Sequence, residues 1–173
     1  MDVVKAIRET CVDFCKALTP DEVQRFVTYT QEKVVGAHEL ISDIGAINDS
    51  FYLIVQGGVH LYQVEGDKEF EVGSIKAGGL VGEMSFFDRK PRTIRLRAYE
   101  KGAVLLEINR QRFNRMRVDE SYIATNLLEF VIRSLDWLIR NLGEENARLY
   151  KLVAQSNQAQ EEHLTKPTPA PIL

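Results

Sequence analysis

The sequence predicts an α+β protein built on an antiparallel β-roll, jelly-roll-like and with about eight strands, with helices at both ends. Between about residues 33 and 108, short runs of alternating apolar and polar residues are separated by turn signals rich in Gly, Asn and Asp. No long helical pattern is inserted between these runs, which is typical of an antiparallel sandwich or roll. Before and after them, apolar residues recur at helical spacing.

Composition limits the class of protein. The chain has 173 residues, which suits one domain with extensions, and its net charge is −3, from 22 basic and 25 acidic residues. This balance gives no general attraction to nucleic acid or to an anionic membrane. No apolar run reaches the roughly 18 residues of a membrane span, and the N-terminus lacks a signal-peptide core. We therefore expect a cytoplasmic protein with no membrane association.

Residues 1–30 are expected to form helices. Apolar residues from Val3 to Leu18 follow a helical period, which predicts one helix with a covered stripe. A second helix is predicted to begin at Pro20, with Thr19 as its N-cap and Glu22 completing a capping box.

Residues 31–116 are expected to form the roll. Alternation predicts strands at Phe51–Val55, Val59–Tyr62 and Phe70–Gly73. The pattern is interrupted within residues 82–93, where the sequence favours a helical turn. Such a local conflict inside a β-fold is typical of a functional site.

Residues 117–156 are expected to form a long helix, after a short one that Asn109 caps and that runs through Met116. Apolar residues repeat every seven positions along two rows: Leu128, Leu135, Leu142 and Leu149, and then Val131, Leu138, Glu145 and Leu152, where Glu145 is the polar exception. The first half of these rows also suits packing on the chain's own roll. Because the repeat continues through Leu149 and Leu152, beyond what one roll can cover, the pattern predicts a coiled-coil seam and a homodimer. Residues 157–173 are rich in Gln, Glu and Pro and are expected to form a flexible tail.

The interruption in the roll has the residue types of a sugar-phosphate site. Gly82 allows close approach of a ligand to the backbone, and a helical turn from Met84 to Phe87 would point amide N–H groups at an anion. Glu83 can accept hydrogen bonds from sugar hydroxyls. Nine positions later, the planar guanidinium of Arg92 can bind a phosphate.

This run, Gly82–Pro91 followed by Arg92 and Thr93, resembles the phosphate-binding cassette of cyclic-nucleotide-binding domains. The segments Asp49–Val59 and Ile75–Val81 are similar to two glycine-containing motifs that precede the cassette in that family. The resemblance covers roughly residues 20 to 140. This family includes the sensory domains of catabolite-activator-type regulators and the regulatory subunits of cyclic-nucleotide-dependent kinases.

The resemblance implies a set of ligand contacts. Glu83 would accept a hydrogen bond from the ribose 2′-hydroxyl, and Arg92 would pair with the cyclic phosphate. The amides at the start of the cassette and after the arginine would complete the anion site, and apolar residues would line the sugar and base. The anion site would comprise Gly82, Met84, Ser85 and Thr93. The apolar wall around the sugar and base would comprise Leu61, Val72, Gly73, Val81 and Leu96.

The implied function is a non-enzymatic, stand-alone sensor without a cofactor. It would bind cAMP, which we favour over cGMP, and relay the signal to an unidentified partner protein by movement of the long helix, which would close as a lid. Thr93 offers a hydroxyl that can contact either a guanine or the phosphate, so the base preference stays open.

About twenty residues follow the long helix, too few for a helix-turn-helix. We therefore expect no direct DNA binding.

Two departures from the family keep a second hypothesis open. Gly79 stands where Asp is usual, and Ile94 and Arg95 stand where two small residues usually follow. The alternative is a dimeric scaffold or assembly module of the same fold that no longer binds nucleotide.

Two further interpretations are less favoured. A metal enzyme on a similar roll would need histidine ligands, and the three histidines have no ligand spacing, so no metal site is expected. The basic residues between 89 and 97 resemble a nucleic-acid patch, but arginines that alternate along a strand are more typical of a solvated face.

Overall fold

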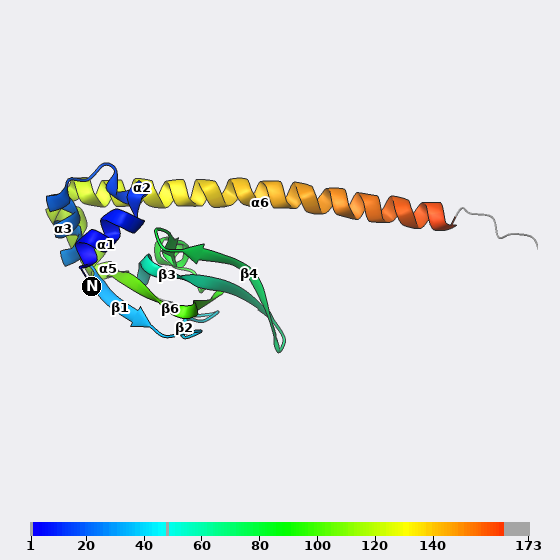
Figure 1. The fold of residues 1–173 in the computed structure, drawn as a ribbon, viewed down its shortest axis with the longest axis horizontal. Coiled ribbons are helices and arrows are strands. Elements are labelled where there is room, and N and C mark those ends of the chain that lie inside the picture. Colours follow the sequence, from blue (N-terminus) through cyan, green and yellow to red (C-terminus); the bar gives the residue numbers. More distant parts are fainter. Residues whose placement is uncertain (1, 48, 165–173) are drawn as a thin grey trace, which may run out of the picture. The chain divides into compact units, whose positions relative to one another are not determined.

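The computed structural model describes residues 2–47 and 49–164, with side chains through residue 155 (Figure 1). The chain divides into two compact units, Met1–Ser134 and Leu135–Leu173. The first unit holds the sheet and most of the helices, and the second begins within the last helix. Among the described residues, no helix is both long enough and apolar enough to cross a membrane.

The N-terminal region forms three helices, α1 (Val3–Thr10), α2 (Val12–Cys15) and α3 (Pro20–Thr28). The single helix expected from Val3 to Leu18 is therefore wrong, because the chain leaves helical geometry at Cys11, with φ −97° and ψ 49°. Cys11 is buried and its Sγ lies 3.8 Å from the carbonyl oxygen of Ile54 on the sheet. After the break, α2 places Phe14 against Phe26 of α3, while Val12 stays exposed.

The predicted capping box at α3 is confirmed. The Thr19 N–H donates to Glu22 Oε2 at 2.7 Å, and the Glu22 N–H donates to Thr19 Oγ1 at 3.3 Å. Two orphan amides of the first turn are satisfied in this way. The helix begins at Pro20, as predicted.

The sheet is antiparallel throughout, which confirms the predicted roll. Its path runs β1, β6, β3, β4, with β2 paired to β6 and β5 paired to β3. The strands are β1 (Gln31–Val35), β2 (Leu40–Ser42), β3 (Ser50–Glu65), β4 (Lys68–Lys76), β5 (Leu80–Val81) and β6 (Arg95–Asn109). A short helix, α4 (Glu83–Asp88), follows β5.

The described part of the chain has six strands and not about eight, because β3 and β6 are long and continuous. The register between them shifts at Ile54/Gln56 and again at Gly57/Val59. At Gly57, φ is +75°, and a Cβ would lie 2.2 Å from the Gly102 carbonyl oxygen. Only glycine permits this close crossing, so segments expected as separate strands bend here without ending.

The interior of the roll is apolar. Its buried residues come from all the strands except β4 and are Val35, Ile41, Tyr52, Ile54, Val59, Val81, Leu96, Ala98, Ala103 and Leu105. A second buried group lies among the helices, where the Phe14 ring is 4.6 Å from Phe26 and 5.8 Å from Phe130. Figure 1 shows α1, α2 and α3 grouped with α5 around the first turns of α6.

Two helices follow the sheet, α5 (Arg110–Asp119) and α6 (Ser121–Leu164). Asn109 caps α5, as predicted, since its side chain accepts from the Arg112 N–H at 2.9 Å. The helix continues beyond Met116, so the expected boundary between residues 116 and 117 falls inside it.

The first turns of α6 are anchored to the N-terminal helices. Ile123, Leu127 and Val131 are buried, and Asn126 Nδ2 donates to the Phe14 carbonyl oxygen at 2.8 Å. α6 extends to Leu164, so residues 157–164 are helical and not part of a tail. The rest of the expected tail, residues 165–173, lies outside the described residues.

Candidate functional site

The segment after β5 forms a tight turn into α4. Gly82 has φ +86° and is the N-cap residue of the helix, and the Phe86 N–H donates to the Gly82 carbonyl oxygen at 3.2 Å. A Cβ on Gly82 would lie 2.5 Å from Nη2 of Arg92. Glycine is therefore required twice, by the backbone angle and by the guanidinium packed against it.

Arg92 is buried, with only 5% of its surface exposed. Its backbone is fixed on both sides, because its N–H donates to Ala46 O at 3.0 Å and its carbonyl accepts from Gly45 N at 2.8 Å. Its Nη2 donates to Ser50 O at 3.2 Å, whereas its buried Nε has no hydrogen-bond partner. An unsatisfied buried donor is costly, and it is a ready contact for an acceptor supplied from outside.

Glu83 is the second buried ionisable group, with 7% of its surface exposed. Burial raises the pKa of this carboxyl, and its own backbone N–H and Arg92 offset the rise only in part. Burial likewise lowers the pKa of Arg92, with Tyr52 and Glu83 opposing the change. The structure describes both Glu83 and Arg92, and no ion pair within 4.0 Å joins them. Two opposite charges are therefore buried beside Gly82 without pairing directly.

The other cassette residues lie around this pair. Met84 is largely exposed, Ser85 is half-buried and Thr93 is exposed. Their amides belong to the first turn of α4 and to the loop after Arg92, the two places from which the sequence predicted anion contacts.

The predicted apolar wall is brought together by the sheet. Leu61 on β3 lies between Gly73 on β4 and Leu96 on β6, and each of the two is its direct partner in the ladder. Leu96 and Val81 are buried in the interior of the roll, with Leu61 packed against them. Val72 lies at the register shift of the β3–β4 pair and is half-exposed.

Sequence reasoning missed the contacts that hold the cassette in place. Arg110 Nε donates to Asp49 Oδ1 at 2.7 Å, its Nη2 donates to the Phe86 carbonyl oxygen, and its guanidinium carbon lies 4.1 Å from the centre of the Phe86 ring. Phe86 also packs against Phe51 and Phe113. The sequence gives no sign of these contacts, because they join residues far apart in the chain.

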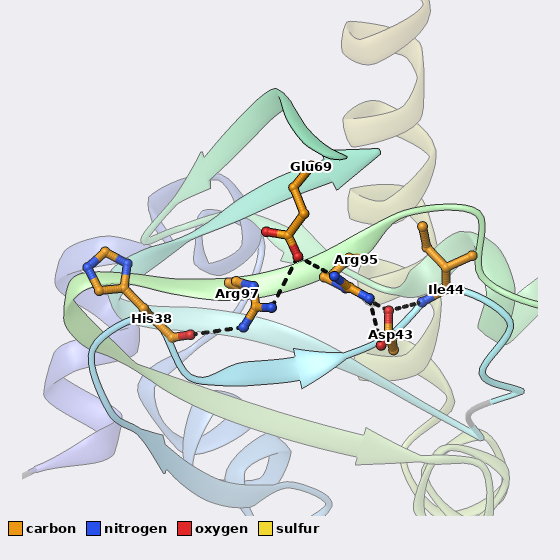
Figure 2. A network of polar contacts seen from close by, with 6 residues as sticks. All are labelled: His38, Asp43, Ile44, Glu69, Arg95 and Arg97. Carbon is orange, nitrogen blue, oxygen red and sulfur yellow. Dashed lines mark hydrogen bonds and ion pairs between the residues drawn. The ribbon is translucent and has the colours of Figure 1, made fainter. Parts of the chain in front are cut away.

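The outer face of the sheet carries a separate ionic network (Figure 2). Arg95 binds Asp43 through two hydrogen bonds, Nε to Oδ1 at 2.7 Å and Nη2 to Oδ2 at 3.0 Å, and its Nη1 donates to Glu69. Arg97 Nη2 donates to the same Glu69 oxygen at 3.2 Å. The alternating arginines are thus partly buried and paired with carboxylates, and are not a free basic face.

No group of three or more His, Cys, Asp or Glu side chains in the described part of the chain is arranged to hold a metal ion. Both ring nitrogens of His60 contact carboxylates: Nδ1 lies 2.8 Å from Glu71 Oε1, and Nε2 lies 3.2 Å from Glu100 Oε1. Cys11 and Cys15 are free thiols, and burial raises their pKa values, that of Cys11 to about 12 and that of Cys15 to about 11. Neither thiol is therefore activated as a nucleophile.

Comparison with known proteins agrees with this arrangement. The family model described as "Cyclic nucleotide-binding domain" matches residues 32–119. A solved cyclic nucleotide-binding domain from Methylobacillus flagellatus KT is similar with a TM-score of 0.72 and 19% identity, over 80% of this chain and 81% of that one. The catabolite activator protein of Thermus thermophilus gives 0.62 and 25%, over 82% of this chain and 63% of that one. The regulatory domain of Toxoplasma gondii PKA, solved with cAMP, gives 0.59 and 16%, over 76% and 49%.

Proposed function

The chain belongs to the cyclic nucleotide-binding domain family, and on that premise we propose that it is a sensor that binds a cyclic nucleotide between α4 and the sheet. The observation that carries the proposal is the state of Arg92, a buried guanidinium whose Nε has no partner. A cyclic phosphate would supply the missing acceptor and the opposite charge.

Each cassette residue has a role in this proposal. Arg92 pairs with the phosphate, and the amides of Met84, Ser85 and Thr93 complete the anion site. Glu83, which is buried, accepts a hydrogen bond from the ribose 2′-hydroxyl. Leu61 and Leu96 provide the apolar wall for the sugar and the base, together with Val72, Gly73 and Val81.

We propose cAMP as the preferred ligand. Thr93 is exposed, and its hydroxyl can reach either the phosphate or a guanine. The ratio of the dissociation constants for cAMP and cGMP, measured in wild type and in Thr93→Ala, separates these roles. Tighter binding of cGMP that is lost in the variant would overturn the preference and assign a guanine contact to Thr93.

The signal would leave the site through α5 and α6. Phe86 of α4 contacts Phe113 of α5, and α5 leads directly into α6. Occupancy that shifts α4 would therefore bias the position of α6, and a partner protein would read that change. Such a relay works only if the ligand binds the two positions of the helix with different affinity.

We also propose that α6 forms a homodimer. Beyond Ser134, the seam residues Leu142, Leu149 and Leu152 are more than half exposed, which is costly unless a second helix covers them. Sedimentation should show a dimer that becomes a monomer in the Leu135→Asp, Leu142→Asp double variant. The Ala147→Asp, Ala154→Asp variant, which places the same charges outside the seam, should stay dimeric. A monomeric wild type would contradict this part of the proposal.

The alternative is a scaffold of the same fold without ligand. This alternative is favoured by Gly79, which stands where Asp is usual in the family, and by Ile94 and Arg95, which stand where two small residues are usual. The unpaired Nε of Arg92 argues against it, because a scaffold has no use for an unsatisfied buried donor. Calorimetric titration of the purified protein with cAMP and cGMP tests the two directly: saturable binding supports the sensor, and no heat with either nucleotide supports the scaffold. Recovery of the nucleotide intact after incubation would show that binding involves no turnover.

A further inference from the structure

One aromatic residue beside the proposed site has no role in the contacts described so far. Phe70 lies on β4, and 48% of its surface is exposed. Its direct partner on β3 is Gln63, two residues beyond Leu61, the partner of Gly73. Because side chains alternate along a strand, Gln63 and Phe70 lie on the same face of the hairpin as Leu61. Phe70 therefore extends the apolar wall outward by two residues, about 7 Å along the strand.

Both neighbours of Phe70 are fixed on the opposite face. Glu69 is bound by Arg95 and by Arg97, which Figure 2 shows reaching it from β6. Glu71 Oε1 lies 2.8 Å from His60 Nδ1. The strand is thus tied to the sheet immediately before and immediately after Phe70. The ring projects from a segment that is held in place, although it is itself half-exposed.

A fixed, exposed aromatic ring next to an apolar wall suits a flat ligand group. Nucleic-acid bases stack on aromatic side chains, and a ring that is already positioned loses little freedom when a base covers it. Gln63 stands directly opposite, with Cβ atoms of such pairs about 5 Å apart. Its amide offers both donors and an acceptor for the edge of a base.

We propose that Phe70 is the stacking platform for the purine base of the bound nucleotide, and that Gln63 contacts the edge of that base. This inference rests on the proposed function. It adds the subsite that distinguishes the base from the phosphate, since Arg92 and Glu83 act only on the parts common to all cyclic nucleotides.

The test compares ligands with and without a base. The full-length protein is titrated with cAMP, with cGMP and with the baseless cyclic ribose 3′,5′-phosphate. Phe70→Ala should weaken binding of both purine nucleotides by about ten- to hundredfold and leave the baseless ligand unchanged. Phe70→Trp should retain purine binding. Gln63→Ala should change the ratio of the cAMP and cGMP affinities.

The control is Val34→Ala, which truncates an exposed apolar side chain on β1 and should change none of these affinities. Thermal melting of each variant checks that the fold is kept. Unchanged purine binding in Phe70→Ala, or equal weakening of the baseless ligand, would overturn the inference while the proposed function stands. Absence of any binding by wild type would instead overturn the proposed function, and this inference with it.

Discussion

Arg92 and Arg95 lie three residues apart, yet their guanidinium groups occupy opposite environments. Arg95 is bound by Asp43 and Glu69 on the outer face of the sheet, and its hydrogen bonds, first to Asp43 and then to Glu69, raise its pKa. Arg92 is buried beside Gly82, has a single carbonyl acceptor and one unpaired nitrogen, and burial lowers its pKa.

Arg95 therefore stabilises the fold, whereas Arg92 keeps a donor that a ligand can bind. Arg95 has its charge neutralised by the protein itself, so a ligand has nothing to add. Arg92 has been desolvated without a full set of acceptors, which stabilises the fold poorly. A bound anion would supply the missing acceptor and the opposite charge to Arg92.

The largest effect is expected from removing the two arginines one at a time. Arg92→Ala should weaken cAMP binding by about 2–5 kcal/mol, because it deletes a buried, hydrogen-bonded charge partner of the phosphate. Arg95→Ala should leave the affinity nearly unchanged, since its partners are on the outer face. Titration calorimetry measures both. Equal losses in the two variants would abolish the distinction between them.

A smaller effect is expected at the glycine that packs against Arg92. Gly82→Ala places a Cβ 2.5 Å from Nη2 and also strains a backbone at φ +86°. Gly66→Ala is the matched control, because Gly66 has φ +59° but open space around it. The backbone strain alone costs about 1–3 kcal/mol of unfolding free energy. Denaturant unfolding should show a larger loss for Gly82→Ala, and calorimetry should show that only this variant loses affinity for cAMP.

The pH dependence of binding tests Glu83. Burial raises the pKa of its carboxyl, and only the ionised form is a pure acceptor for a ribose hydroxyl. Affinity for cAMP should therefore fall as the pH is lowered through this raised pKa. Glu83→Gln should bind more weakly at neutral pH and show a flatter profile over the same range. A wild-type affinity that stays constant as the pH is lowered from 7 to the ordinary glutamate pKa of about 4.3 would contradict a contact between Glu83 and the ligand.

The smallest effect is expected from His60 on the outer face. Burial lowers the pKa of His60, but hydrogen bonds to Glu71 and Glu100 outweigh it, so the pKa in the folded protein is raised. The protonated ring therefore stabilises the fold at pH values below the unfolded pKa of about 6.5, and this contribution is lost as the pH rises through the folded value. Denaturant unfolding of wild type and His60→Gln across this range should differ at low pH and converge at high pH. Parallel curves would contradict the assignment.

Local features of the fold were predictable from the sequence because their causes are local. The capping box at Thr19 and Glu22, the cap at Asn109 and the helical turn after Gly82 each depend on residues a few positions apart. The identity of Glu83 and Arg92 as candidates came from their residue types and spacing, and their role in binding stays a prediction.

Other features depend on contacts between distant segments. Arg92 meets Ser50 across 42 positions, and Arg95 meets Asp43 across 52. The break at Cys11 follows from packing on the sheet, which helical periodicity does not register. Whether an arginine is satisfied is also a property of the folded chain, so the sequence did not distinguish Arg92 from Arg95 on this ground.

The most direct test of the account observes the unpaired nitrogen itself. The Nε–H resonances of Arg92 and Arg95 are assigned by nuclear magnetic resonance with the help of the two alanine variants, and cAMP is then added to saturation. We expect the Arg92 Nε proton to move strongly downfield as it gains a phosphate acceptor, while the Arg95 resonance stays in place. Saturation with cAMP that leaves the Arg92 resonance unchanged would show that Arg92 Nε does not bind the phosphate.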